Sequence, residues 1–251
     1  VEDDELDVTI EHNTCVKAVT TTTSTNNGGK SQISQIHTNR GVIEVPKDVK
    51  VVVAAGSWTS HILALMGLYA PVYPLKGYSM TVSAKEVLES NPQLKEADLP
   101  SRIVADKYLY TSRLGDDIRI TSIGEFSGWD TSPTPDADEE FRRESLSRMP
   151  QLAPFIHKAP TLCGHRPYVS DGLLLLGKIP AIENLFVSVG PGSNGWKLAM
   201  GSGDIINRLV DGQSKEQIKE ECGFDVGALD PAGRVVSAPI FSKICRARWD
   251  I

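Results

Sequence analysis

The stretch NLFVSVGPGSNGWKLAMGSGDIINRLV, residues 184–210, joins an apolar run to a helical pattern through a glycine-rich turn. The apolar run 184–189 predicts a buried strand, and residues 195–210 predict a helix that ends at an Asp-Gly pair. Between them GPGSNG is a literal G-x-G-x-x-G, the spacing of dinucleotide-binding turns. The stretch therefore predicts a strand–turn–helix unit and raises the question of what the turn binds.

A dinucleotide fingerprint needs more than this spacing, because a second parallel strand ending in an acid must follow the helix. The segment that follows, DGQSKEQIKEECGFD (211–225), is polar and helix-like, and Pro191 removes one backbone donor from the turn. We therefore do not expect pyrophosphate binding here. The helix N-terminus still favours an anion or a group that becomes negative, and the alternative is that the glycines only allow a tight turn.

Composition narrows the class of protein. The chain has 251 residues, of which 40% are apolar, so it can bury a sizeable core, and its net charge of −6 gives no uniformly basic surface. Nucleic acid is therefore not an expected partner. The cysteines are far apart and form no C-x-x-C pair, which predicts neither a metal site nor a disulfide framework: Cys15, Cys163, Cys222 and Cys245.

Targeting signals are not apparent in the sequence. The apolar runs are too short to span a bilayer, and the acidic start VEDDELD resembles neither a signal nor a transit peptide. We expect an intracellular protein, cytoplasmic or mitochondrial, with at most peripheral membrane contact. Because the sequence opens on Val1 and not on methionine, we also expect it to continue something longer.

The first seventy residues carry strand patterns and one helix. Alternating residues 6–22 and 32–45, separated by the turn-forming STNNGGKS, predict a β-meander. VVVAAG (51–56) predicts a fully buried strand, and SWTSHILALMG (57–67) predicts a helix with Ser57 or Thr59 as its N-cap.

The middle of the chain is more polar. Residues 70–84 begin with two prolines and then alternate, which predicts a strand at a domain crossing. Residues 107–130 predict a hairpin that turns at 114–117, and residues 136–149 predict a helix ended by Pro150. The predicted domains are 1–70 and 164–213 for one, 71–163 for a second, and 214–251 for a carboxy-terminal tail.

Several segments together carry a family resemblance. VVVAAGSWTS (51–60), KGYS (76–79), RLGDDIRI with GEFSG (113–128) and GHRPYVSDG (164–172) precede the opening stretch in order. From about residue 6 to residue 212 the sequence resembles the carboxy-terminal part of the D-amino acid dehydrogenase family, which includes glycine oxidase and D-amino acid oxidase.

The resemblance implies FAD as the cofactor and a mixed α/β (α+β) fold. An incomplete FAD-binding domain, made of a β-meander, a strand and a helix, would accompany a substrate domain with an antiparallel sheet. In this family the dinucleotide fingerprint lies at the extreme amino terminus. We therefore expect a missing amino-terminal FAD-binding segment, supplied by further residues or by a partner chain.

The resemblance also assigns substrate-binding residues. Arg166 matches the arginine that grips the carboxylate of an amino acid substrate, with a structural ion pair as the alternative. Tyr108 or Tyr110 would help to bind or cover the substrate, or would pack on the sheet. Tyr78 matches a position near the flavin, and Lys76 matches either a cofactor contact or a surface ion pair.

The implied cofactor contacts fall in three segments. The turn before the last helix would lie beneath the isoalloxazine ring, the end of the VVVAAG strand would touch the cofactor, and a backbone peptide would meet the adenine. The residues are, in that order, Gly192, Ser193, Asn194, Gly195 and Trp196; Gly56, Ser57 and Trp58; and Val16.

The implied reaction is oxidation of a D-amino acid, or a related small amine, at Cα. The α-hydride passes to flavin N5, and the imino acid then hydrolyses to a 2-oxo acid and ammonia, which requires no catalytic base. The rival interpretation is a catalytically silent relative that acts as a structural or interaction subunit after losing the pyrophosphate-binding segment.

Overall fold

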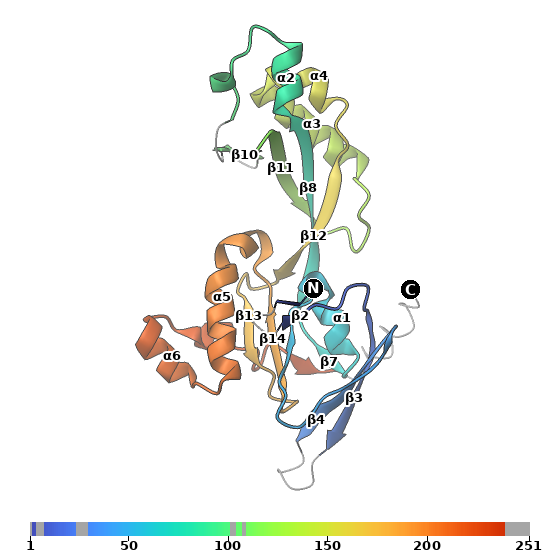
Figure 1. Cartoon of the computed structure of the whole chain (residues 1–251), viewed down its shortest axis with the longest axis vertical. Coiled ribbons are helices and arrows are strands. Elements are labelled where there is room, and N and C mark those ends of the chain that lie inside the picture. The colour runs from blue at the N-terminus through green and yellow to red at the C-terminus, as the bar shows by residue number, and fades with distance from the viewer. Residues whose placement is uncertain (1, 4–7, 24–29, 101–103, 107–108, 239–251) are drawn as a thin grey trace. The chain divides into compact units, whose positions relative to one another are not determined.

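The computed structural model describes residues 2, 3, 8–23, 30–100, 104–106 and 109–238. The chain divides into two compact units, one made of Val1–Tyr73 with Pro167–Ile251 and the other of Pro74–Arg166 (Figure 1). We call them unit 1 and unit 2. The sequence predicts these two crossings at 70/71 and 163/164.

In the described residues, unit 1 contains four small sheets. Strand β14 pairs in parallel with β6 and antiparallel with β13, while the meander β3-β4-β5 is antiparallel throughout, as predicted. The remaining pairs are β1 with β2 and β7 with β15. The strands are β1 Glu2–Asp3, β2 Val8–Thr9, β3 Val16–Thr23, β4 Ser31–Thr38, β5 Gly41–Glu44, β6 Val51–Val53, β7 Leu68–Tyr69, β13 Leu175–Lys178, β14 Leu185–Val189 and β15 Val236–Ser237.

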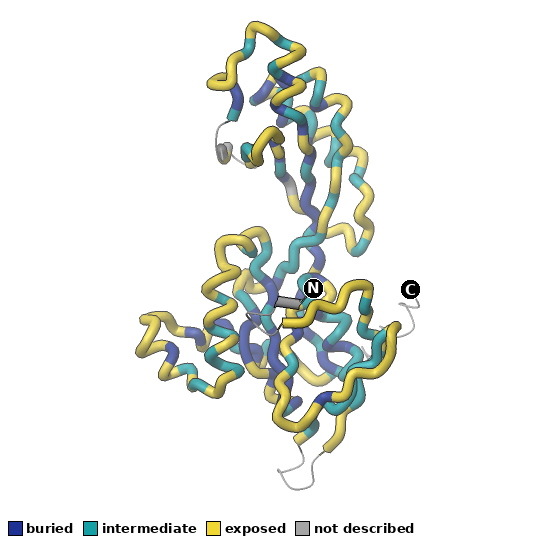
Figure 2. The backbone as a smooth tube through the Cα atoms, viewed as in Figure 1, coloured by how far each residue is buried: buried dark blue, intermediate teal, exposed yellow. Residues whose placement is uncertain are grey.

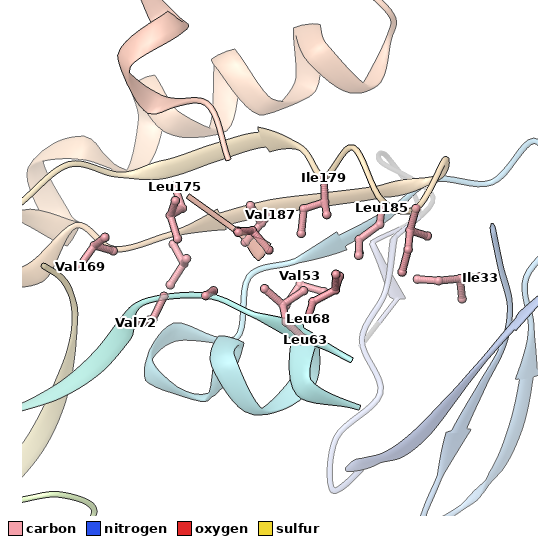
Figure 3. Packing of buried hydrophobic residues seen from close by; sticks show 14 of the residues in the cluster. Ile33, Val53, Leu63, Leu68, Val72, Val169, Leu175, Ile179, Leu185 and Val187 are labelled. Carbon is pink, nitrogen blue, oxygen red and sulfur yellow. The ribbon is translucent and has the colours of Figure 1, made fainter. Parts of the chain in front are cut away.

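The part of unit 1 that the structure describes also has three α-helices: α1 Thr59–Ala64, α5 Gly195–Val210 and α6 Lys215–Cys222. The apolar core lies between the β13-β14-β6 sheet and α1, where Leu175, Leu185 and Val187 approach Leu63 and Leu68 (Figure 3). Alternate residues of β14, Leu185, Val187 and Val189, supply this core, while Phe186 between them is also buried, as expected for a strand covered on both faces. The predicted strand–turn–helix unit is thus confirmed.

The prediction that the VVVAAG strand is fully buried is wrong in one respect. Val53 belongs to the core, whereas Val52 is 41% exposed. Strand β6 is the end strand of its sheet among the described residues, and successive side chains point to opposite faces. The face that carries Val52 therefore lacks the cover that Val53 receives.

Asn184 joins the meander to this sheet. Its side chain is buried and accepts a hydrogen bond from the Ile33 amide at 2.9 Å. Its amide nitrogen donates to the carbonyls of Ile33 at 3.1 Å and Val49 at 3.2 Å. One side chain thus bonds three backbone groups, two on Ile33 of β4 and one on Val49, which precedes β6.

Replacing Asn184 with alanine should lower the free energy of unfolding by about 3 kcal/mol, because buried backbone groups lose their partners. Chemical denaturation measures this loss. Asn207, which is exposed on α5, provides the matched asparagine-to-alanine control and should change stability by less than about 0.5 kcal/mol. An Asn184 variant as stable as the control would contradict this role.

Unit 2 is built on a five-stranded sheet of order β12-β8-β11-β10-β9, in which the pairs from β8 to β9 are antiparallel. The predicted hairpin is confirmed, with its arms ending at Leu114 and starting again at Asp117. The strands are β8 Val72–Ser83, β9 Val104–Asp106, β10 Leu109–Leu114, β11 Asp117–Glu125 and β12 Leu162–Val169; the helices are α2 Ala84–Ser90, α3 Pro135–Arg148 and α4 Ala153–Ile156.

The alternation of side chains along strand β8 shows which face of this sheet is buried. Its even-numbered residues Tyr78, Met80 and Val82 lie in the core, where Tyr78 meets Phe141 of α3. The alternation places the odd-numbered residues on the opposite face. Figure 2 colours the backbone by the burial of each described residue. Among the odd-numbered residues of β8, Gly77 alone is buried, and the side chain of Arg166 lies against it.

Candidate functional site

The glycine-rich turn of unit 1 leaves the start of α5 without a side-chain cap. Gly190 and Gly192 have φ of 96° and 54°, values that favour glycine, and a short 3-10 turn, Gly192–Asn194, leads into the helix. Asn194 is the N-cap residue, but its side chain accepts no hydrogen bond from the first turn. The amides that open α5 can therefore serve a ligand acceptor.

The neighbouring residues keep this turn accessible. Ser193 and Asn194 are exposed, and Trp196 is 96% exposed on the first turn of α5. After α5 comes helix α6, which confirms that no strand follows here to close a dinucleotide-binding unit. The predicted cofactor residues of this turn thus lie together at one exposed helix end.

A second group of predicted cofactor residues lies where β6 ends. Gly56, Ser57 and Trp58 form a 3-10 turn, and Gly56 has φ of 55°. The predicted cap of α1 is wrong, because the N-cap residue is Trp58 and no side chain caps the helix. The hydroxyls of Ser57 and Thr59 are instead buried without a hydrogen-bond partner in the described part of the chain.

Such orphaned hydroxyls are costly unless a ligand or water satisfies them. This segment therefore has the polar groups that a cofactor contact requires. Val16, the predicted adenine contact, begins β3 in the same unit and pairs with Thr38.

In unit 2, the Arg166 side chain lies across Gly77. A Cβ atom placed on Gly77 would fall 2.5 Å from Cζ and Nη2 of Arg166. The guanidinium therefore lies on the sheet face opposite α3. Burial lowers the pKa of Arg166 from its ordinary value, and the electrostatic effect of Tyr110 opposes this change.

Tyr110 shares this face of the sheet. It pairs with Thr121, which pairs with Ser79, and Ser79 lies on the same side of β8 as Gly77. Tyr110 is 52% exposed, so its ring is not packed in the core. The structure thus brings Arg166 and Tyr110 to one open face, whereas Tyr108 lies outside the described residues.

Lys76 and Tyr78 point to the other face. Lys76 is fully buried, and its ammonium pairs with Glu125 at 2.7 Å and donates to the Ser132 carbonyl at 2.8 Å. The Tyr78 hydroxyl donates to Glu125 at 2.7 Å and accepts from the Thr134 amide at 2.9 Å.

These bonds give Lys76 and Tyr78 partners inside unit 2, and the contacts predicted for them near the flavin stay predictions. Contact with a ligand would require the network to open, and the alternative of a surface ion pair is wrong because the Lys76 side chain is buried. Both residues instead fix strand β8 to the start of α3.

Sequence reasoning missed Glu125, the acceptor at the centre of this network. Partial burial acts to raise its pKa, but hydrogen bonds from Lys76, Thr134 and Tyr78 outweigh burial and lower the pKa to about 2. The same pair raises the pKa of Lys76 despite its burial. The sequence did contain a signal for this residue. Glu125 is the acid at the end of strand β11 that pairs with the KGYS segment, so it was a candidate partner for Lys76.

Comparison with known proteins decides the family. Residues 4–209 match the family model described as FAD dependent oxidoreductase. The chain belongs to the FAD-dependent oxidoreductase family. This confirms the resemblance found in the sequence, and FAD is the cofactor of the family.

Relatives of the chain include a D-amino acid dehydrogenase of Vibrio vulnificus, 34% identical over 226 residues that cover 87% of this chain and 47% of the relative. The chain therefore spans about half the length of that relative. An uncharacterised oxidoreductase of Halorhodospira halophila is 33% identical over 82% of this chain and 84% of its own length.

Solved structures support the mixed α/β fold predicted for the family member. Glycine oxidase from Geobacillus kaustophilus superposes with a TM-score of 0.62 at 23% identity, over 86% of this chain and 51% of the other. Iminodiacetate oxidase from Chelativorans sp. superposes with a TM-score of 0.60 at 26% identity, over 78% and 49%. Within the described ranges, no helix is both long and apolar enough to cross a membrane.

Proposed function

We propose that the chain is the substrate-binding unit and the later part of the FAD-binding unit of an amino acid dehydrogenase or oxidase. Its substrate would be a D-amino acid or a related small amine, oxidised at Cα to an imino acid that hydrolyses to a 2-oxo acid and ammonia. The observation that carries the proposal is the half-buried guanidinium of Arg166 on the open face of the unit 2 sheet.

Arg166 suits a substrate carboxylate. Two parallel N–H groups of a guanidinium meet two carboxylate oxygens, which fixes the orientation of the carboxylate and of the attached Cα. Partial burial strengthens such a pair because water screens it less. Tyr110, on the same face, can donate a further hydrogen bond to the carboxylate or cover it.

Unit 1 fits a cofactor that carries polar and anionic groups. The uncapped amides of α5 bear the partial positive charge of a helix N-terminus, which favours a group that becomes negative. The buried hydroxyls of Ser57 and Thr59 supply further donors. When bound, FAD would supply the two-electron acceptor that protein side chains lack.

Absorbance spectroscopy of the purified protein tests this proposal. Flavin bands near about 370 and 450 nm that bleach on addition of a D-amino acid are expected, with the L-enantiomer as the matched control. Once the amino-terminal FAD-binding segment is supplied, a protein that stays colourless after incubation with FAD would contradict the proposal. It would favour the alternative of a catalytically silent structural subunit.

A further inference from the structure

Within the proposed function, on which this inference rests, we propose that Gly77 is the positioning residue of Arg166. The absence of a side chain at Gly77 would set where the guanidinium lies and hence where a substrate carboxylate binds. The observation is geometric. A Cβ atom on Gly77 would lie 2.5 Å from Cζ, 2.5 Å from Nη2 and 2.7 Å from Nε of Arg166.

The backbone at Gly77 has little freedom to retreat from an added methyl group. Strand β8 lies between β12 and β11 in the sheet, and Gly77 pairs with Gly124 of β11. On either side of Gly77, Lys76 and Tyr78 are buried and bonded to Glu125. Moving the strand would therefore disrupt the unit 2 core and its buried ion pair.

The side chain of Arg166 is the part that can move. All three atoms near the added Cβ belong to the end of this flexible side chain. The backbone of Arg166 lies in strand β12, and the following Pro167 favours an extended conformation at Arg166. An alanine at position 77 should therefore displace the guanidinium and leave both strands in place.

The displacement matters because a bidentate contact depends on orientation. A shift of about 1 Å in a positioning group can cost a large factor in binding or rate. Glycine at position 77 lets the planar guanidinium lie directly against the strand, which is why this odd-numbered residue of β8 is buried while its neighbours on that face are not.

The test compares Gly77→Ala with Gly164→Ala. Gly164 lies in β12, two residues before Arg166, and a Cβ atom there would meet nothing within 4 Å. The first readout is the side-chain Nε–Hε NMR resonance of Arg166, assigned by its loss in Arg166→Ala. We expect this resonance to shift in Gly77→Ala and to stay in place in Gly164→Ala.

The second readout is binding of acetate, a simple carboxylate, followed through the same resonance. Gly77→Ala should weaken acetate binding by about tenfold, or about 1.4 kcal/mol, and Gly164→Ala by less than about twofold. If amino acid oxidation is found, Gly77→Ala should raise KM by a similar factor and change kcat by less than about twofold. If Gly77 had a purely structural role, its replacement would not raise KM while leaving kcat nearly unchanged.

A double-mutant cycle separates positioning from folding. In the Arg166→Ala background, Gly77→Ala should cause no further loss of acetate binding and little change in melting temperature, because the clash is gone. Overturning results are an unshifted Arg166 resonance with normal acetate binding, or a Gly77→Ala variant that unfolds equally with and without Arg166.

The two proposals fail in different ways. If the unmodified protein binds no carboxylate and oxidises no amino acid, the proposed function fails. The resonance shift and the melting-temperature cycle then still decide whether Gly77 positions Arg166.

Discussion

Replacing Arg166 with leucine should raise the KM for an amino acid substrate by at least about tenfold, roughly 1.4 kcal/mol of lost binding. The reason is that leucine fills part of the space above Gly77 but offers no donors to the carboxylate. Steady-state kinetics measures KM. An amine substrate without a carboxylate should be affected much less.

Arg119 provides the matched control for this substitution. It is exposed on β11, where it pairs with Thr81 on the same sheet. Arg119→Leu removes the same charge and should leave KM within about twofold of its original value. Equal KM values for the Arg166 variant and the unmodified protein would remove Arg166 from the substrate site.

Replacing Lys76 with methionine should destabilise unit 2 by about 3 kcal/mol or more, because it leaves the Glu125 carboxylate partly buried without its cation. Methionine preserves most of the volume, so lost packing contributes little. Chemical denaturation followed by circular dichroism measures the loss. Lys85→Met on α2, where the side chain is exposed, is the control.

The double variant Lys76→Met with Glu125→Gln separates two effects on stability: the attraction between the two charges, and the cost of burying either charge without its partner. Removing both charges should recover part of the stability, because no uncompensated charge remains in the core. If Lys76→Met alone is as stable as the control variant, the network does not hold β8 against α3.

The same pair predicts how stability depends on pH. The pKa of Glu125 is lowered from 4.5 to about 2 in the folded chain, so its ionised form stabilises the fold at any pH above its unfolded value. That contribution should disappear as the pH falls from about 4.5 towards about 2. In Lys76→Met the pKa of Glu125 should rise, and this part of the acid dependence should shrink.

Local pattern was sufficient for several elements. The alternation of β3 and β4, the turn at 114–117 and the helix 195–210 all follow from neighbouring residues, because strand and helix periods are short-range signals. The family resemblance likewise needed only the order of short motifs. These features could be predicted without knowing which residues meet.

The prediction for VVVAAG failed for the opposite reason. Its composition indicates a strand buried on both faces, but burial of Val52 depends on what covers that face. The caps expected at Ser57 or Thr59 failed similarly, since the path of the chain into α1 placed Trp58 at that position. The residue type indicates whether a side chain can be buried or can cap a helix. Its neighbours in the folded chain decide whether it is buried or caps the helix.

By itself the sequence determined the strand–turn–helix unit, the hairpin, the meander and the membership of a flavin-dependent family. Only the tertiary structure decided that Lys76 and Tyr78 face Glu125 and that Arg166 lies across Gly77. Adjacent residues of one strand point to opposite faces, so KGYS alone cannot tell which face is buried. That choice is made by distant segments, α3 on one side of the sheet and Arg166 of β12 on the other.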